Sequence, residues 1–183
     1  MLHTFKEIFG EAKGYLIEDP SIDGVFVSCC DLDVETRSLN LFLESDTYID
    51  GSVFLAVKAQ LKRALGLSKL ELSVKFSKDC FCTESCKDAV DELRRKSAML
   101  NGYFNKAEYR IDGSNVNIEL KFGGLDIIEN TDFANKFAAI IKRDYDCDVT
   151  VSFSGVTENA ELLPPPVEEM APPPVRKAEP VKQ

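Results

Sequence analysis

Hydrophobic residues in the first half of the chain switch between helical spacing and strand-like alternation. Apolar positions three or four residues apart are typical of one face of a helix, and apolar residues at every second position are typical of a half-buried strand. We expect Pro20 to end the first helix and Gly66 to cap the second. The predicted elements are a helix over 5–16, strands over 24–32 and 38–43, a helix over 51–65 and a strand over 69–76.

The second half of the chain repeats this order of elements without a visible repeat of the sequence itself. Thr83 is predicted as the N-cap of the next helix, and Asp112-Gly113 is typical of a tight hairpin turn. Both halves therefore read α-β-β-α-β. The predicted elements are a helix over 83–100, strands over 106–111 and 114–122, a helix over 131–145 and a strand over 148–153.

These patterns predict an α+β chain with two small tandem domains, at 1–80 and 81–157. Each domain would hold a three-stranded sheet with helices on one face, because one face of each strand is apolar. A single six-stranded sheet is the alternative. Seven of the eight prolines lie in 161–183, so 158–183 is predicted to be a disordered, proline-rich linker, or alternatively a PxxP ligand.

Composition narrows the possible functions. The net charge is −9, from 22 Lys and Arg against 31 Asp and Glu, which disfavours a dedicated nucleic-acid coat. No apolar run approaches the length of a membrane span, and charges from position 6 onwards argue against a secretory signal. We therefore expect a cytoplasmic protein with no membrane partner.

The supply of catalytic residues is poor. A nucleophilic triad would have to use His3, the single histidine of the chain. Cys80, Cys82 and Cys86 form a cluster that resembles a set of metal ligands, but the first spacing is too short for zinc and a second cysteine pair is missing. Adjacent Cys29 and Cys30 lie in a predicted strand, so one should point into the core and one outward. We expect reduced thiols, several of them buried, no cofactor, and no catalytic residue in this chain.

The order of elements, with room for an extra helix before the last strand, is that of a type II KH module, which binds single-stranded nucleic acid. Such a module clamps the backbone with a G-x-x-G loop between two helices. Here the corresponding stretch has adjacent Gly123 and Gly124, followed by the acidic Asp126 and Glu129. The sequence therefore predicts a pseudo-KH topology with a degenerate loop that would repel phosphate.

Basic side chains on two predicted helices form a possible docking patch. Solvated helix faces account for such clusters as well, so a patch for an acidic partner is the sharper of two interpretations. Asp31, Asp33 and Glu35 lack the glycine and the closing glutamate of a calcium loop and are interpreted as a polar hairpin tip. The possible patch consists of Lys58, Lys62, Arg63, Arg94 and Arg95.

Residues 101–155 carry a family resemblance. Asn101-Gly102, Ala107-Glu108-Tyr109, Asp112-Gly113 and the run IELKFGGLDII, followed by a helix and the VTVSF strand, resemble the second N-terminal domain of the PolC-type DNA polymerase III alpha subunit of Gram-positive bacteria. Upstream, ALGLSKLELSVKF and the helix over 83–100 are similar to the junction between the first and second N-terminal domains. The resemblance covers about residues 1–157.

This resemblance implies a non-catalytic segment of a replicative polymerase, whose polymerase, exonuclease and metal-binding domains would lie beyond Gln183. It implies docking to replisome proteins, among them the clamp-loader tau subunit, with DNA contacted through the other domains of the polymerase. The proline-rich segment would lead into those domains. Two alternatives remain open: a KH-like module that binds single-stranded nucleic acid, and an adaptor that presents its proline-rich segment as a ligand.

Overall fold

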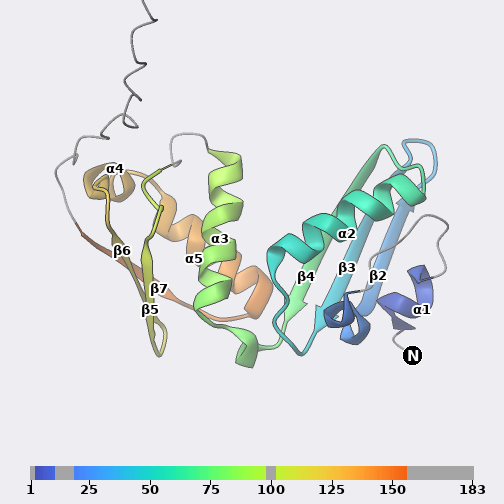
Figure 1. Cartoon of the computed structure of the whole chain (residues 1–183), viewed down its shortest axis with the longest axis horizontal. Helices are drawn as coiled ribbons and strands as arrows, with labels where there is room; N and C mark the ends of the chain where they lie inside the picture. The colour runs from blue at the N-terminus through green and yellow to red at the C-terminus, as the bar shows by residue number, and fades with distance from the viewer. Residues whose placement is uncertain (1–2, 11–18, 98–101, 156–183) are drawn as a thin grey trace, which may run out of the picture.

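A computed structural model describes residues 3–10, 19–97 and 102–155 as a mixed α+β fold with two sheets (Figure 1). The predicted proline-rich linker at 158–183, and Ala12, Leu16 and Leu100 of the predicted helices, lie outside the described residues. The strands of the first sheet are β1 (His3–Thr4), β2 (Phe26–Asp33), β3 (Ser38–Ser45) and β4 (Lys69–Phe76), and those of the second are β5 (Glu108–Asp112), β6 (Asn115–Leu120) and β7 (Thr150–Gly155).

The described part of the chain also contains five α-helices and two short 3₁₀ helices. Their bounds are α1 (Phe5–Phe9), η1 (Pro20–Gly24), α2 (Gly51–Ala64), η2 (Lys78–Cys80), α3 (Thr83–Lys96), α4 (Leu125–Glu129) and α5 (Phe133–Tyr145). None of the described helices is long and apolar enough to cross a membrane.

The first sheet has the order β1-β2-β3-β4, with β3 and β4 parallel and the other pairs antiparallel. Two parallel neighbours need a crossover, and α2 provides it. Asp50 accepts a hydrogen bond from the backbone N–H of Ser52 and starts α2, while Gly66, with a φ of 65°, ends it. The prediction of three strands was wrong, because His3 and Thr4 pair with Val27 and Phe26 at the edge of β2.

The second sheet has the order β5-β6-β7, with an antiparallel hairpin and a parallel pair. Gly113 turns the hairpin with a φ of 58°. The crossover from β6 to β7 contains α4 as well as α5, so this half reads α-β-β-α-α-β. Because the strands form two separate sheets, the alternative of one six-stranded sheet is excluded.

The start of α3 corrects another prediction. Cys82 is the N-cap, and Thr83 is already the first helical residue. The hydroxyl of Ser85 accepts the backbone N–H of Cys82 at 2.9 Å and donates to the Cys82 carbonyl at 2.6 Å. These bonds start the helix one residue earlier than an N-cap at Thr83 would.

Cys29 and Cys30 are both exposed, so the prediction that one of them points into the core was wrong. The register between β2 and β3 shifts between Val27 and Cys29, as a β-bulge does. Beyond the bulge every residue of β2 is exposed, including Leu32. Cys30 and Leu32 pair with Leu41 and Leu39, which are buried, so alternation alone does not bury a residue even beside a buried strand.

Each sheet has its own hydrophobic core. The first is built from residues such as Leu41, Leu43 and Leu61. The second contains Ile118 and Phe137, together with the buried Cys80 and Cys86. Phe76, the last residue of β4, packs against both cores.

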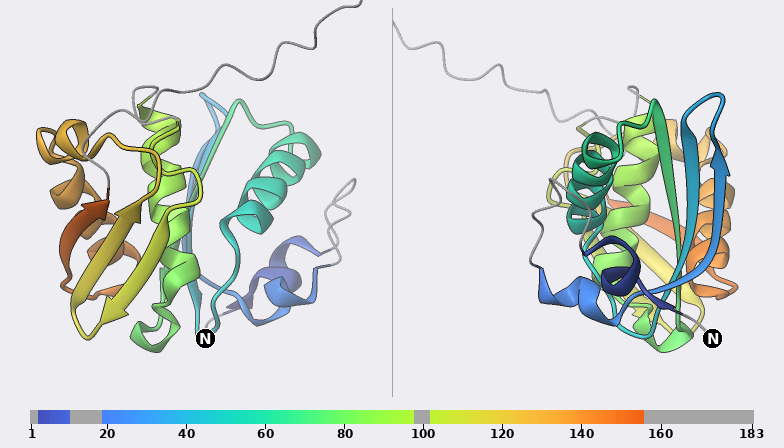
Figure 2. Two further views of the ribbon diagram at one scale, coloured as in Figure 1. Left: turned by 60° about the vertical axis from the view of Figure 1, so that its left-hand side comes forward. Right: turned by 90° about the vertical axis from the view of Figure 1, so that its right-hand side faces the viewer.

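Figure 2 shows how the two halves are arranged. Helix α3 lies between the second sheet and the half that contains β4 and α2. The C-terminal end of α5 packs against β4. The two halves thus meet along β4, α3 and α5, and the space between α2 and α3 is where a site shared by both halves can form.

Candidate functional site

The two halves of the molecule are joined by an aromatic contact and a partly buried carboxylate. The rings of Phe76 and Tyr145 stack with centroids 5.0 Å apart. Asp88 of α3 accepts hydrogen bonds from the Tyr48 hydroxyl at 2.7 Å and from the backbone N–H of Gly51 at 3.0 Å. Gly51 is the first residue of α2, so an acid from one half satisfies a free N–H at the start of a helix in the other.

Burial dominates the electrostatics of this joint. It raises the pKa of Asp88, although Tyr48 and Gly51 both donate to the carboxylate. It also raises the pKa of Tyr48, and the hydrogen bond to Asp88 adds to that shift. A carboxylate held by two donors that do not titrate near neutral pH fixes the junction without adding a positive charge.

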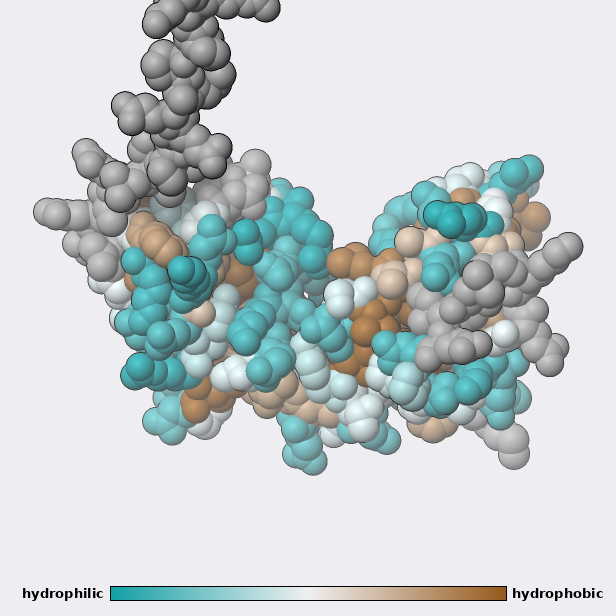
Figure 3. All heavy atoms as spheres, in the orientation of Figure 1, coloured by the Kyte–Doolittle hydropathy of each residue, from teal (hydrophilic) through white to brown (hydrophobic). Residues whose placement is uncertain are grey.

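Above this joint lies a groove of about 500 Å³ between α2 and β4 on one side and α3 and α5 on the other. In Figure 3 the hollow between the two halves has hydrophobic residues on the α2 side and hydrophilic residues on the α3 side. We call this the inter-sheet groove. Its lining comprises Ile49, Gly51, Phe54, Leu55, Lys58, Glu71, Leu72, Ser73, Val74, Phe76, Ser85, Asp88, Ala89, Glu92, Arg95, Lys96, Ile140, Arg143, Asp144 and Tyr145.

The apolar wall of the groove comes from α2 and β4. Leu55 is 48% exposed, and Phe54, Leu72 and Val74 are partly exposed. Phe54 also contacts Phe76 edge-on, with ring centroids 6.2 Å apart. Exposed apolar residues that gather in a concave site are typical of a binding surface rather than of ordinary protein exterior.

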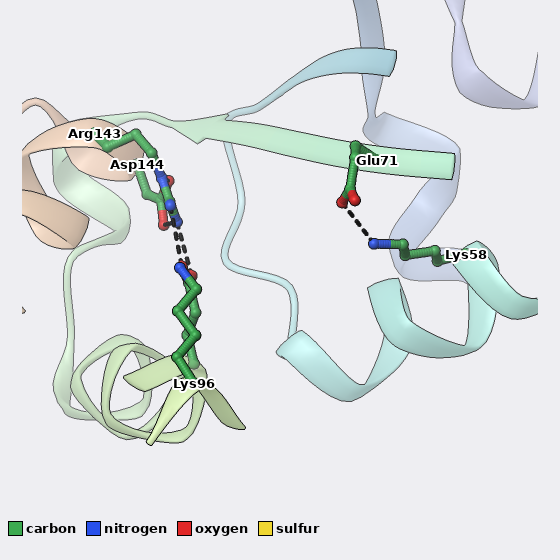
Figure 4. A network of polar contacts seen from close by, with 6 residues as sticks. Lys58, Glu71, Lys96, Arg143 and Asp144 are labelled. Atoms are coloured by element: carbon green, nitrogen blue, oxygen red, sulfur yellow. Dashed lines mark hydrogen bonds and ion pairs between the residues drawn. The ribbon is translucent and has the colours of Figure 1, made fainter. Parts of the chain in front are cut away.

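Charged residues form the rims of the groove (Figure 4). On one rim Lys58 of α2 contacts Glu71 of β4 at 2.7 Å. On the other, Arg143 of α5 donates two hydrogen bonds to Glu92 of α3, at 2.8 and 3.1 Å, and Lys96 contacts the same carboxylate at 2.7 Å. The Glu92–Arg143 pair therefore ties α3 to α5 on the wall that faces the apolar residues.

The two carboxylates near Arg143 behave differently. Hydrogen bonds from Arg143 lower the pKa of Glu92 to about 2, and Lys96 contributes to this shift. Asp144 also contacts Arg143, at 2.6 Å, but burial outweighs that contact and raises its pKa. Arg143 is held charged between them, and its own pKa is raised.

The possible docking patch divides on the structure. Lys58 and Arg95 line the groove, whereas Lys62 and Arg63 are exposed on α2 outside it. Arg94 contacts Asp91 of its own helix at 3.1 Å and does not line the groove. The exposed guanidinium of Arg95 has no ion pair or hydrogen bond with the described residues.

The glycine pair of the degenerate loop has a different position from that expected of a KH loop. Gly123 and Gly124 both have positive φ values, 79° and 87°, and lie between β6 and α4. The connection between α4 and α5 is Asn130–Asp132 instead. Asp126 lies in the first turn of α4. A Cβ on Gly124 would overlap the ring of Tyr103, so packing alone accounts for this glycine.

The structure places Cys82 close to both Cys80 and Cys86. Burial raises the pKa of Cys86 to about 12, so its thiol is protonated near neutral pH. His3 lies on β1, with its Nδ1 3.7 Å from Glu7. Over 3–10, 19–97 and 102–155, no three His, Cys, Asp or Glu side chains are arranged to hold a metal ion. Asp33 accepts from the backbone N–H of Thr36, as a polar hairpin tip does.

Comparison with family models, curated proteins and solved structures found no match to this chain.

Sequence reasoning missed most of the groove. Leu55 lies off the buried stripe of α2, which carries Val57 and Leu61, whereas Phe54 lies on that stripe and is partly buried. An exposed leucine off the buried stripe of a helix is a sequence signal for a second contact surface, and it could have been used. The pairing of Glu92 with Arg143, 51 residues away, has no such signal.

The Glu92–Arg143 pair gives a prediction about pH. Because its folded pKa lies near 2, Glu92 stabilises the fold above about pH 4.5, and that contribution is lost as the pH falls from about 4.5 to about 2. Glu92→Gln should lower the free energy of unfolding by about 1–2 kcal/mol at pH 7, less than the pKa shift alone implies, because Arg143 is half exposed. Urea unfolding from pH 2 to 7 measures the difference.

The matched control is Glu119→Gln. Glu119 contacts Lys121 on the second sheet, outside the groove, and it is solvent-screened. We expect a smaller effect from it at every pH. A gap between Glu92→Gln and the unmodified chain that stays constant down to pH 2 would contradict the assigned role of Glu92.

Proposed function

We propose that this chain is a protein-docking segment that performs no chemistry itself and binds its partner in the inter-sheet groove. The observation that carries the proposal is the groove, with the half-exposed Leu55 and the partly exposed Phe54 on one wall and ion-paired side chains on the rims. An apolar centre bordered by polar groups is the usual composition of a protein interface.

The resemblance to the N-terminal region of the PolC-type polymerase supports a docking role in the replisome, with the clamp-loader tau subunit as the first partner to test. Single-stranded nucleic acid is less well supported. The basic groups that line the groove, apart from Arg95, are engaged by acidic side chains (Lys58, Lys96 and Arg143). Asp126 follows the glycine pair, where it would repel a phosphate.

A pair of leucines on α2 makes the test specific. Leu55 lines the groove, and Leu65, 42% exposed at the end of the same helix, does not. Titration calorimetry with a purified tau subunit from a low-GC Gram-positive bacterium should show binding. Leu55→Glu should weaken this binding about tenfold or more, because the substitution would bury a charge against the partner. Leu65→Glu should leave the affinity unchanged.

Two results would contradict the proposal. Equal losses from Leu55→Glu and Leu65→Glu would place binding outside the groove. Tight binding to labelled single-stranded DNA, measured by fluorescence anisotropy and falling steeply between low and near-physiological salt, would mean real phosphate contacts and would favour a nucleic-acid module.

A further inference from the structure

The free edge of β4 gives the groove a more specific capability. β4 is the last strand of its sheet, and β3 is its only strand partner among the described residues. Glu71, Leu72, Ser73 and Val74, four consecutive residues of β4, line the groove. The groove therefore runs along an open strand edge, which is a template for pairing with another extended segment.

The backbone groups that face the groove can be assigned from the register. Ser77 donates its N–H to Ser45 of β3, and Lys69 donates to Arg37, which precedes β3. Successive residues of a strand direct their N–H and C=O groups to opposite sides, so odd-numbered residues of β4 face β3. The N–H and C=O groups of Leu72 and Val74 consequently point to the open side, toward the groove.

The stretch of β4 that lines the groove favours an extended occupant over a helix, because Glu71 to Val74 line it consecutively. Four extended residues span about 13 Å, the scale of that stretch. Four residues in a helix make little more than one turn, which is unstable alone. The stacked Phe76 and Tyr145 close one end of this space.

Charge indicates one feature of the occupant. The acidic groups of the lining all have donors: Glu71 has Lys58, Glu92 and Asp144 have Arg143, and Asp88 has Tyr48 and Gly51. Arg95 is exposed on the opposite rim and has no such partner within the described part of the chain. A carboxylate on the occupant would give Arg95 the partner that the other basic side chains of the lining already have.

We propose that the inter-sheet groove binds an extended peptide segment of a partner protein, which adds to the edge of β4 as a further strand, places alternate apolar side chains against Phe54 and Leu55, and presents an acidic side chain to Arg95. This inference rests on the proposed docking function and specifies its ligand. Main-chain hydrogen bonds to Leu72 and Val74 supply affinity, and the apolar wall and Arg95 supply selectivity.

The test begins with a library of random 12-residue peptides displayed on phage and selected on the immobilised full chain. We expect enriched peptides with alternating apolar residues, an Asp or Glu, and no proline in the paired stretch. A synthetic peptide of the enriched sequence is then titrated into ¹⁵N-labelled full chain. The backbone amides of Leu72 and Val74 should shift and should exchange with solvent more slowly when the peptide is bound, a readout that needs no mutation.

Variants of the full chain make the test specific. Val74→Pro removes one outward N–H while leaving the bonds to β3, and proline is tolerated where an edge N–H faces solvent. It should weaken the peptide about tenfold, with folding checked by circular dichroism. Arg95→Glu should weaken it about fivefold or more. Arg63→Glu makes the same charge change on an exposed part of α2 outside the groove and should have no effect.

Three outcomes overturn the inference. One is the absence of enriched peptides. Another is a peptide that binds without protecting Leu72 and Val74 and that is insensitive to Val74→Pro but sensitive to Leu55→Glu; this keeps the docking function and rejects the strand. The third is a concentration-dependent dimer, abolished by Val74→Pro, which would make a second copy of this chain the occupant. Binding of tau that is insensitive to Leu55→Glu would instead reject the proposed function itself.

Discussion

Tyr145→Ala is expected to lower the free energy of unfolding by about 3–5 kcal/mol, the largest loss from any single change considered for this protein. Tyr145 is 4% exposed, stacks on Phe76 at 5.0 Å and lies 5.8 Å from Phe81. Removing the ring leaves a cavity at the point where α5 meets β4. Because Phe76 packs against both hydrophobic cores, the cavity also removes packing that makes the halves unfold together.

The measurement is urea unfolding followed by NMR at amides in each core, such as Leu41 in the first sheet and Ile118 in the second. In the unmodified chain the two amides should report one transition. In Tyr145→Ala the second half should unfold at lower urea than the first. Tyr145→Phe keeps the stacked ring and is the control, for which we expect coincident transitions. Coincident transitions in Tyr145→Ala, with a loss below about 1 kcal/mol, would contradict the role assigned to the stack.

The alternation of hydrophobic residues predicted most elements because burial in this protein is mainly one-sided. Leu39, Leu41 and Leu43 alternate in the sequence and are all buried on β3. The helix stripe at Val57 and Leu61 is buried in the same way. Where a strand is exposed on both faces, alternation no longer predicts which residues are buried, as at Cys29 and Cys30 in β2.

Short and capped elements were harder to predict. β1 has two residues and no pattern of its own, and it exists because His3 and Thr4 lie beside β2. α4 has five residues, too few for a helical pattern, and lies in the stretch expected to form a degenerate loop. The start of α3 depends on the hydroxyl of Ser85, which bonds the backbone of Cys82 and makes Cys82 the N-cap in place of Thr83. These are choices between nearly equivalent local arrangements, which tertiary contacts decide.

The groove could not be predicted because it belongs to neither half alone. It requires β4 to remain an edge strand, Tyr145 to reach Phe76 across 69 positions of the chain, and Asp88 to bond Gly51. The basic patch expected from the sequence includes Lys58 and Lys62, four positions apart on one helix face, yet only Lys58 and Arg95 of these three line the groove. Sequence spacing places residues on a helix face, but contacts between elements decide what that face meets.

The glycine pair leads to the second prediction with a large effect. Gly124→Ala should lower the free energy of unfolding by about 3 kcal/mol, because the backbone has a φ of 87° and the new methyl group would overlap the ring of Tyr103. Gly113→Ala is the matched control. Gly113 also has a positive φ, 58°, but no atom lies within 4 Å of its added Cβ, so only the conformational cost of about 1 kcal/mol should appear.

A double-mutant cycle separates packing from ligand binding at this position. If Gly124 is required because Tyr103 lies against it, Gly124→Ala should cost only about as much as Gly113→Ala once Tyr103 has also been replaced by alanine. Urea unfolding of the four chains gives the coupling energy. If Gly124→Ala leaves stability unchanged but weakens single-stranded DNA binding, the glycine lies at a nucleic-acid contact, because a backbone that must approach a phosphate closely cannot accept even a methyl group. A loss of stability that Tyr103→Ala relieves, with no DNA binding to weaken, would explain the glycine by packing and leave the inter-sheet groove as the binding surface.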